Sequence, residues 1–266
     1  GNAVSFLLTS EVARMLGARI RLRIDDLDAE RARAACVDDI FASLRWLGIA
    51  WQEGPADRQS HERDHSQAHR MPRYLHHLHV LKEQGDLYAC ACSRSAARRR
   101  PCDCRGKGLP FDAPNVAWRL RVPADALVRM EGIFHHARWL SPAELLPDPV
   151  LRQRAEAGGR PAYQIASLID DADHGITHIV RGEDLLPSTA CQLYLADRLC
   201  LAAFQRVRFL HHPLITDEQG RKLSKSEGAA SLKAMRAAGV GPDALRRRAG
   251  ELLLALREGA PQSSSP

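Results

Sequence analysis

The 266-residue sequence predicts an α/β protein whose parallel, helix-flanked sheet is interrupted by a small α+β insertion. Helix and strand patterns alternate before residue 88, and the alternation resumes after residue 160. The span between them is rich in proline and arginine, contains short strand-like pieces and has poor helical periodicity. Strands that alternate with helices are typical of a parallel sheet, because each parallel connection needs a crossover.

The first part of the chain predicts three helices and two strands. Residues 2–17 have apolar side chains at helical spacing and end in a glycine, which predicts an amphipathic helix. The alternating stretch 18–24 (ARIRLRI) predicts a strand. After a charged loop, residues 36–48 predict a second helix that is again closed by a glycine. Residues 70–85 predict a third helix, and 86–94 predict a short strand that leads into a cluster of cysteines.

The second part predicts the remaining elements of the sheet. Residues 162–185 predict a helix or a strand, a charged turn, and a buried strand at 176–180 that ends at Arg181. A helix at 188–200 and a strand at 206–215 follow. We expect Arg181 near a ligand, because ligands of open α/β sheets bind outside the carboxyl ends of the strands.

These patterns divide the chain into four parts. Residues 1–87 form the first half of the sheet domain, and residues 88–160 form the inserted subdomain, which includes the strand-like piece NVAWRLRVP. Residues 161–235 form the second half of the sheet domain. Residues 236–266 form a short helical tail whose polar end, APQSSSP, predicts disorder.

Composition argues against two classes of protein. No run of about 18 apolar residues is present, and the N-terminal segment has no basic flank or small-residue cleavage site. The sequence therefore predicts neither a membrane span nor a secretory signal, and we expect a cytoplasmic protein. Lys and Arg number 38 against 32 Asp and Glu, which suits a polyanionic partner but is common among solvated proteins.

Four of the seven cysteines form two Cys-x-Cys pairs, Cys90 with Cys92 and Cys102 with Cys104. Four thiolates from two chelating pairs suit tetrahedral zinc. With four cysteine ligands no position is left for water, so the zinc would be structural. Two disulfides or free thiols are the alternatives, and they are disfavoured because the loop between the pairs has almost nothing apolar to fold around.

The stretch RKLSKSEGA, residues 221–229, places three basic side chains around two serines and could hold a polyphosphate or be a solvated turn. Its core KLSKS follows a strand and resembles the Lys-Met-Ser-Lys-Ser loop of class I aminoacyl-tRNA synthetases. The resemblance to the glutamyl branch of that family covers essentially residues 1–230. It is carried, in order and spacing, by RIDDLDAERAR, LGIAWQEGP, SQAHRMPRY, YACACSR, AYQIASLIDDADHGITHIVRGEDLL and HHPLITDEQGRKLSKSEGA.

The resemblance implies a Rossmann-type catalytic domain with a zinc-bearing insertion. About 40 residues follow the loop, too few for an anticodon-binding domain, so the chain is similar to the short, queuosine-directed group of the branch. That group activates glutamate with ATP and Mg²⁺ and transfers it to queuosine in the anticodon of tRNA(Asp). We expect glutamate and tRNA(Asp) as partners and a monomer. Two alternatives stay open: a non-catalytic nucleotide- or tRNA-binding module, and a truncated conventional glutamyl-tRNA synthetase.

The resemblance assigns the phosphate chemistry to the loop. Lys225 matches the second lysine of the family loop and would hold the triphosphate while negative charge builds up during adenylate formation, with Lys222 assisting. Ser224 and Ser226 would donate hydrogen bonds to ATP. Gly228 would give the loop room to move.

The resemblance assigns the amino-acid substrate to three residues. Arg181 and Tyr163 would bind the substrate, although Tyr163 alone is equally typical of core packing. Asp25 matches a family glutamate that receives the substrate ammonium, and its shorter side chain would reach it directly or through water. Four further aspartates are interpreted as helix caps and turn residues: Asp26, Asp28, Asp170 and Asp171.

The zinc ligands can also be carried over from the family. Cys90, Cys92 and Cys104 match its first, second and last ligands. The third is often a tyrosine four residues before the last cysteine, a position that Arg100 occupies in this chain. Cys102 would therefore supply the third ligand.

The sequence departs from the family at its start. Gly1 matches the glycine of the His-x-Gly signature. The resemblance therefore implies that the family's first strand, its signature histidine and an arginine for the substrate side chain are missing from this sequence. The chain is either a fragment of a longer enzyme or a degenerate paralogue. We expect a fragment, because the KLSKS loop, Arg181 and Tyr163 are intact.

Overall fold

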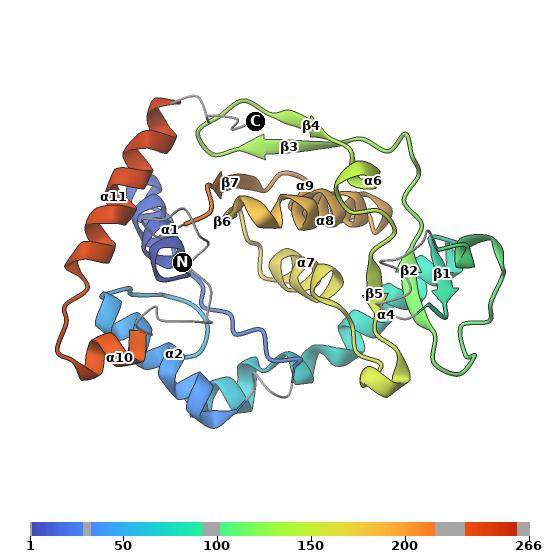
Figure 1. Cartoon of the computed structure of the whole chain (residues 1–266), viewed down its shortest axis with the longest axis horizontal. Coiled ribbons are helices and arrows are strands. Elements are labelled where there is room, and N and C mark those ends of the chain that lie inside the picture. Colours follow the sequence, from blue (N-terminus) through green and yellow to red (C-terminus); the bar gives the residue numbers. More distant parts are fainter. Residues whose placement is uncertain (1, 29–32, 93–101, 216–231, 260–266) are drawn as a thin grey trace.

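The computed structural model describes residues 2–28, 33–92, 102–215 and 232–259 (Figure 1). The helices are α1 (Asn2–Leu16), α2 (Ala34–Leu47), α3 (Arg58–Ser60), α4 (Met71–Glu83), α6 (Pro142–Leu145), α7 (Tyr163–Asp173), α8 (Leu186–Arg198), α9 (Ala202–Gln205), α10 (Leu232–Ala237) and α11 (Asp243–Glu258). The strands are β1 (Leu87–Cys90), β2 (Ala117–Leu120), β3 (Val128–Gly132), β4 (Arg138–Leu140), β5 (Val150–Arg152), β6 (His178–Gly182) and β7 (Arg208–His212). Short helical turns lie at η1 (His61–His65), η2 (Gln67–Arg70), η3 (Cys104–Gly106), η4 (Ala155–Ala157) and η5 (Glu183–Leu185).

The main sheet has the strand order β4-β3-β7-β6. β3, β7 and β6 are parallel, and β4 is antiparallel to β3. The edge strand β6 pairs with β7 from His178 opposite Arg208 to Gly182 opposite His212. The chain reaches β7 from β6 through α8 and α9, which confirms the predicted parallel connection in the second part of the chain.

The predicted insertion does not form one unit. β1, β2 and β5 make a separate antiparallel sheet, but β3 pairs with β7 through Glu131 and Gly132. The expectation that all of 88–160 stands apart is therefore wrong for 128–140. β7 pairs with β6 along one edge and with β3 along the other, so both of its edges are hydrogen-bonded. Local sequence patterns do not reveal that β3 is the second partner.

The prediction of a strand at 18–24 is also wrong, because this segment does not form a regular strand. Arg21 forms an isolated bridge with Glu53, and the Leu22 amide donates to the Glu53 carbonyl at 2.8 Å. The segment is thus extended. Its Ala18 amide donates to the Ala13 carbonyl at the end of α1, and its other backbone partners among the described residues lie at 52–53. Side-chain contacts must therefore contribute much of what holds it in place.

Four helices lie where the spacing of apolar residues predicts them. α1, α2, α4 and α8 match the predicted spans closely, and Gly48 adopts the left-handed conformation (φ 71°) that ends α2. The sequence predicted either a helix or a strand at the start of 162–185. This segment folds as the helix α7, in which Ile165, Leu168 and Ile169 are buried at helical spacing. β6 is only half-buried, and Arg181 is its one buried residue.

The largest apolar core joins the two sheets through α4, α7 and α8. α7 lies between α4 and α8 and contacts both (Figure 1). α1 and α11 lie side by side at the opposite end of the molecule and share a smaller core with β6 and β7 (Figure 1). No helix in the described parts of the chain is long and apolar enough to cross a membrane.

Candidate functional site

Two adjacent carboxylates, Asp170 and Asp171, are buried in the interior of α7, where they are 1% and 8% exposed. Their interpretation as helix caps and turn residues is wrong. Neither residue lies at a helix end, and both side chains accept hydrogen bonds from residues distant in the sequence. A buried carboxylate is stable only when it is paired and hydrogen-bonded, so these partners are essential.

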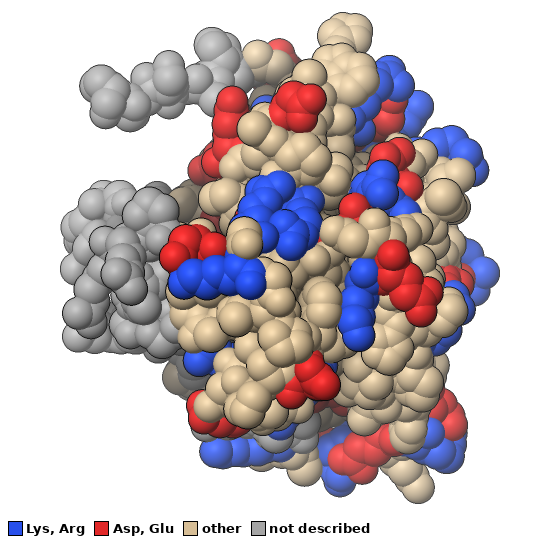
Figure 2. Space-filling model, turned by 90° about the vertical axis from the view of Figure 1, so that its right-hand side faces the viewer, with Lys and Arg blue, Asp and Glu red and all other residues tan. Residues whose placement is uncertain are grey.

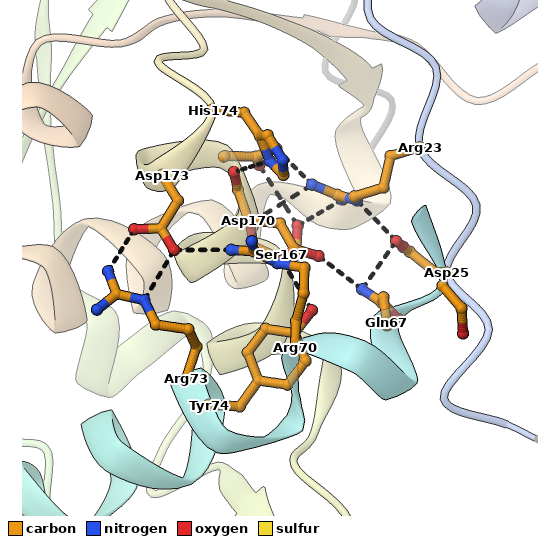
Figure 3. Close-up of polar contacts among 12 residues, drawn as sticks. Arg23, Asp25, Gln67, Arg70, Arg73, Tyr74, Ser167, Asp170, Asp173 and His174 are labelled. Carbon is orange, nitrogen blue, oxygen red and sulfur yellow. Dashed lines mark hydrogen bonds and ion pairs between the residues drawn. The ribbon is translucent and has the colours of Figure 1, made fainter. Parts of the chain in front are cut away.

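Asp170 accepts hydrogen bonds from three donors (Figure 3). The Arg70 Nε donates at 2.5 Å, the Tyr74 hydroxyl at 2.7 Å and the Gln67 Nε2 at 2.8 Å. Burial and the nearby Asp170 carboxylate raise the pKa of Tyr74, so its hydroxyl stays protonated and available as a donor. Asp170 thereby joins α7 to α4 and η2.

Asp171 forms an ion pair with Arg23. The same guanidinium donates to the Ser167 Oγ at 2.9 Å and, through Nε, to Asp25 Oδ1 at 2.7 Å. Burial alone would lower the pKa of Arg23, but Asp171 and Asp25 raise it, so the side chain is charged. Burial likewise raises the pKa of Asp171, and Arg23 opposes this shift. Arg23 therefore ties the extended segment 18–24 to α7.

Asp25 lies at the open side of this network, with 41% of its side chain exposed. Its Oδ1 accepts from Arg23 and, at 3.3 Å, from the Gln67 Nε2 (Figure 3). Within the described chain its Oδ2 has no hydrogen-bond partner. The carboxylate is thus held in place through one oxygen and presents the other to solvent.

Arg181 is the buried cation of the site and is 6% exposed. Its Nη1 donates to the Gln192 Oε1 at 2.9 Å, and its guanidinium lies 5.5 Å from the centre of the Phe209 ring. No ion pair joins Arg181 to a described carboxylate. Burial lowers the pKa of Arg181, whereas Tyr163, Asp171 and Asp25 act in the opposite direction. The buried guanidinium therefore remains available to an anionic ligand.

The three residues predicted to bind the amino acid lie in one neighbourhood. Tyr163 is the first residue of α7 and is 38% exposed. It and Asp25 both act electrostatically on Arg181. An exposed tyrosine and a half-exposed carboxylate thus lie near a buried guanidinium. The loop residues Lys222, Ser224, Lys225 and Ser226 lie outside the described residues.

Sequence reasoning missed three residues that build this neighbourhood, Arg23, Gln67 and Gln192, and it interpreted a fourth, Asp171, as a cap or turn residue. The best signal was for Gln192, which stands within the apolar run from Ala190 to Ala196 on a helix that is buried around most of its circumference. A polar residue in such a position usually has a buried partner. Arg23 and Gln67 gave no comparable signal, because their partners are distant in the sequence.

The four cysteines also come together. The Sγ atoms of Cys90, Cys92, Cys102 and Cys104 lie within 4.8 Å of one another. Cys90 ends β1, and Cys104 begins η3. The closest Sγ pairs are 3.5 to 3.6 Å apart, which is well beyond a disulfide bond. Four convergent thiols of this kind could hold a metal ion.

The family model of the class I tRNA synthetases (E and Q), catalytic domain, matches residues 1–105 and 115–255. The chain belongs to this family. It is accordingly a ligase of the aminoacyl-tRNA synthetase class.

Curated relatives support the assignment. The chain is 33% identical to a protein named Glutamyl-Q tRNA(Asp) synthetase from Rhodobacter capsulatus, over 94% of each chain. It is 38% identical to a protein of the same name from Burkholderia cenocepacia, over 88% of this chain and 78% of the relative.

Two solved structures show that this synthetase has the α/β fold of the family. The glutamate-tRNA synthetase from Elizabethkingia anophelis aligns with a TM-score of 0.66 at 21% identity, over 91% of this chain and 52% of its own. A glutamate tRNA ligase from Elizabethkingia meningosepticum, in complex with its amino acid, aligns with a TM-score of 0.64 at 21% identity, over 90% and 51%. The synthetase spans about half the length of these two chains.

The Asp170 network predicts a large loss of stability for Asp170→Asn. The change removes a buried charge that pairs with Arg70, and we expect a loss of about 3 kcal/mol in the free energy of unfolding. The control Asp173→Asn removes a more exposed partner of Arg70 and Arg73 and should cost about 1 kcal/mol or less. Urea denaturation measures both, and equal losses would show that Asp170 is not the stronger link.

His211 predicts a loss of stability in acid. Burial and the nearby Arg181 lower its pKa to about 3, while its Nε2 contacts the Thr189 Oγ1 at 2.9 Å. Since the unfolded chain titrates near pH 6.5, it binds more protons than the folded chain below that pH, and stability falls as the pH falls. Between pH 7.0 and 5.5 this group contributes a loss of about 1 kcal/mol.

The substitution His211→Gln should remove that part of the pH dependence. The control His136→Gln changes an exposed histidine and should leave the dependence as it is in the parent. Urea denaturation of the three proteins at both pH values provides the comparison. An unchanged slope in the His211 variant contradicts the prediction.

Proposed function

We propose that this synthetase activates glutamate with ATP and transfers it to queuosine in the anticodon of tRNA(Asp). One observation carries the proposal: Arg181 is buried without a described carboxylate partner, beside Tyr163 and Asp25, in a family member whose relatives are named Glutamyl-Q tRNA(Asp) synthetase. A buried guanidinium without a counter-ion favours an anionic substrate.

The charges of the site are complementary to an amino acid. Arg181 binds a substrate carboxylate, because a guanidinium offers a carboxylate two parallel N–H donors. Asp25 accepts from the substrate ammonium through its Oδ2, directly or through water. Tyr163, at the exposed start of α7, supplies a hydroxyl between the buried cation and solvent.

Activation joins the glutamate carboxylate to the α-phosphate of ATP and releases pyrophosphate. The carboxylate oxygen forms the new P–O bond as the bond to the leaving pyrophosphate breaks, which gives the adenylate. Lys225 stabilises the negative charge that builds up on the phosphates, Lys222 assists, and Ser224 and Ser226 donate hydrogen bonds to the nucleotide. These roles rest on the family resemblance of the loop, and Mg²⁺ accompanies the ATP.

In the second step a nucleophilic group of queuosine attacks the activated carbonyl of the adenylate and AMP leaves. The net charge of +6 suits a polyanionic partner such as tRNA. On the face shown in Figure 2, basic and acidic side chains are interspersed, so the charge there does not form one continuous basic surface. Substrate assays are therefore a sharper test of the tRNA than the charge distribution.

Isotope exchange between ATP and pyrophosphate tests the proposal. We expect exchange that depends on glutamate, followed by transfer of labelled glutamate to tRNA(Asp) that carries queuosine and not to the same tRNA with guanosine at that position. Transfer to the acceptor end of tRNA(Glu) would instead indicate a conventional glutamyl-tRNA synthetase. The absence of exchange, with and without tRNA, would favour a non-catalytic binding module.

The same assay should be sensitive to Arg181→Lys. Lysine cannot reproduce the bidentate contact, so we expect kcat/KM for glutamate to fall by about 10- to 100-fold, equivalent to about 1.5–3 kcal/mol. The control Arg208→Lys makes the same change at an exposed position of β7 and should have little effect. Unfolding temperatures of both variants separate this loss from a loss of folded protein.

We also propose that the four clustered cysteines hold a structural Zn²⁺. Four Sγ atoms within 4.8 Å of one another fit the donor set and the size of a tetrahedral zinc–thiolate site. The apolar surroundings of the cluster are small, comprising little more than Tyr88 and Leu109, so a metal would supply stability that the local core does not. Zinc would cross-link the end of β1 to η3.

Metal analysis of the purified protein should find about one zinc per chain. Cys102→Ser should lower the zinc content and the unfolding temperature, because it removes one of four ligands. Cys36→Ser is the matched control, since Cys36 is exposed and outside the cluster. A metal-free protein whose four clustered thiols all titrate freely with a thiol reagent contradicts the site.

A further inference from the structure

The Arg181 guanidinium is held by neutral groups alone among the described residues. The Gln192 Oε1 accepts from its Nη1 at 2.9 Å, and the Phe209 ring lies 5.5 Å from the guanidinium carbon. Neither contact removes the positive charge. Buried arginines are usually paired with a carboxylate, because burying an unpaired charge is costly. The neutral surroundings of this one therefore call for an explanation.

The nearby acidic groups are engaged elsewhere. Asp171 pairs with Arg23 and lies 3.4 Å from the Ser167 Oγ, and Asp25 accepts from Arg23 at 2.7 Å. His211 faces Arg181 across the β6–β7 register and adds no negative charge. Both carboxylates are thus engaged by Arg23, and neither forms an ion pair with Arg181.

The second observation is the unsatisfied amide nitrogen of the Gln192 side chain. Gln192 is fully buried in α8, and its Nε2 has no hydrogen-bond partner among the residues that the structure describes. An unsatisfied buried N–H costs stability, and an apolar side chain of the same shape would avoid that cost. A glutamate at this position would have removed both the orphan N–H and the unpaired charge of Arg181. The amide is the one choice among these that accepts from Arg181 without giving it a counter-ion.

We propose that Gln192 is a positioning residue: its carbonyl oxygen fixes the Arg181 guanidinium while its neutrality keeps the charge of Arg181 for a substrate carboxylate. This inference rests on the proposed glutamate-activating function. It assigns substrate affinity, rather than the chemical step, to the choice of an amide at this position of α8. Gln192 acts through Arg181 and does not itself contact the substrate.

Two substitutions separate positioning from packing. Gln192→Glu supplies a carboxylate that competes with the substrate for Arg181, so KM for glutamate in ATP–pyrophosphate exchange should rise at least about tenfold, with kcat much less changed. The same variant pairs a buried cation, so its unfolding temperature without ligand should rise by about 2–4 °C. Gln192→Met removes the acceptor, so KM should rise while the unfolding temperature falls.

Gln84→Glu is the control for added charge, because Gln84 is exposed at the end of α4. It should leave KM and the unfolding temperature as in the parent. A merely structural glutamine would give a different pattern, in which both Gln192 variants lose thermal stability and neither changes KM selectively. That pattern, or a KM within twofold of the parent for Gln192→Glu, overturns the inference.

The test also distinguishes this inference from the function on which it rests. If the parent shows no glutamate-dependent exchange, the proposed function fails, and the unfolding temperatures still decide the state of Arg181. An equal or lower unfolding temperature for Gln192→Glu then shows that the Arg181 charge is not free, and the inference fails as well. If the parent exchanges normally and the variants do not differ, only the inference fails.

Discussion

The pairing of two adjacent carboxylates on α7 with two arginines from the first half of the chain is the interaction on which the site depends. Asp170 binds Arg70, and Asp171 binds Arg23. Backbone pairing alone does not hold the segment that carries Arg23, because this segment has one isolated bridge within the described chain. Side-chain ion pairs therefore position Asp25, two residues after Arg23, against the helix that begins with the exposed Tyr163.

The same pairing divides the charges of the site into two kinds. Arg23 and Arg70 are satisfied by buried carboxylates and hold the structure together (Figure 3). Arg181 has a neutral amide and an aromatic ring instead, so its charge is available for binding. A buried charge attracts opposite charges strongly at short range. Because the neighbours of Arg181 are neutral, the site favours an anionic ligand.

The sequence predicted part of the candidate site well. The resemblance of the chain to one family brought Asp25, Tyr163 and Arg181 together as candidates, and the structure places them in one neighbourhood. Their roles stay predictions. Residues that act through a partner were missed, because Arg23 and Gln192 lie in ordinary strand-like and helical patterns. The role of Arg23 depends on Asp171, 148 positions along the chain, and that of Gln192 depends on Arg181, which lies on a different element.

The sequence by itself determined four of the helices and the family. Periodicity and closing glycines are local signals, so α1, α2, α4 and α8 could be predicted from them. Only the tertiary structure decided that β3 joins β7, that 18–24 forms no regular strand, and that Asp170 and Asp171 are buried links rather than caps. Strand partners and buried ion pairs join distant residues, and a local pattern carries no information about which distant residue will supply the missing hydrogen bond or charge.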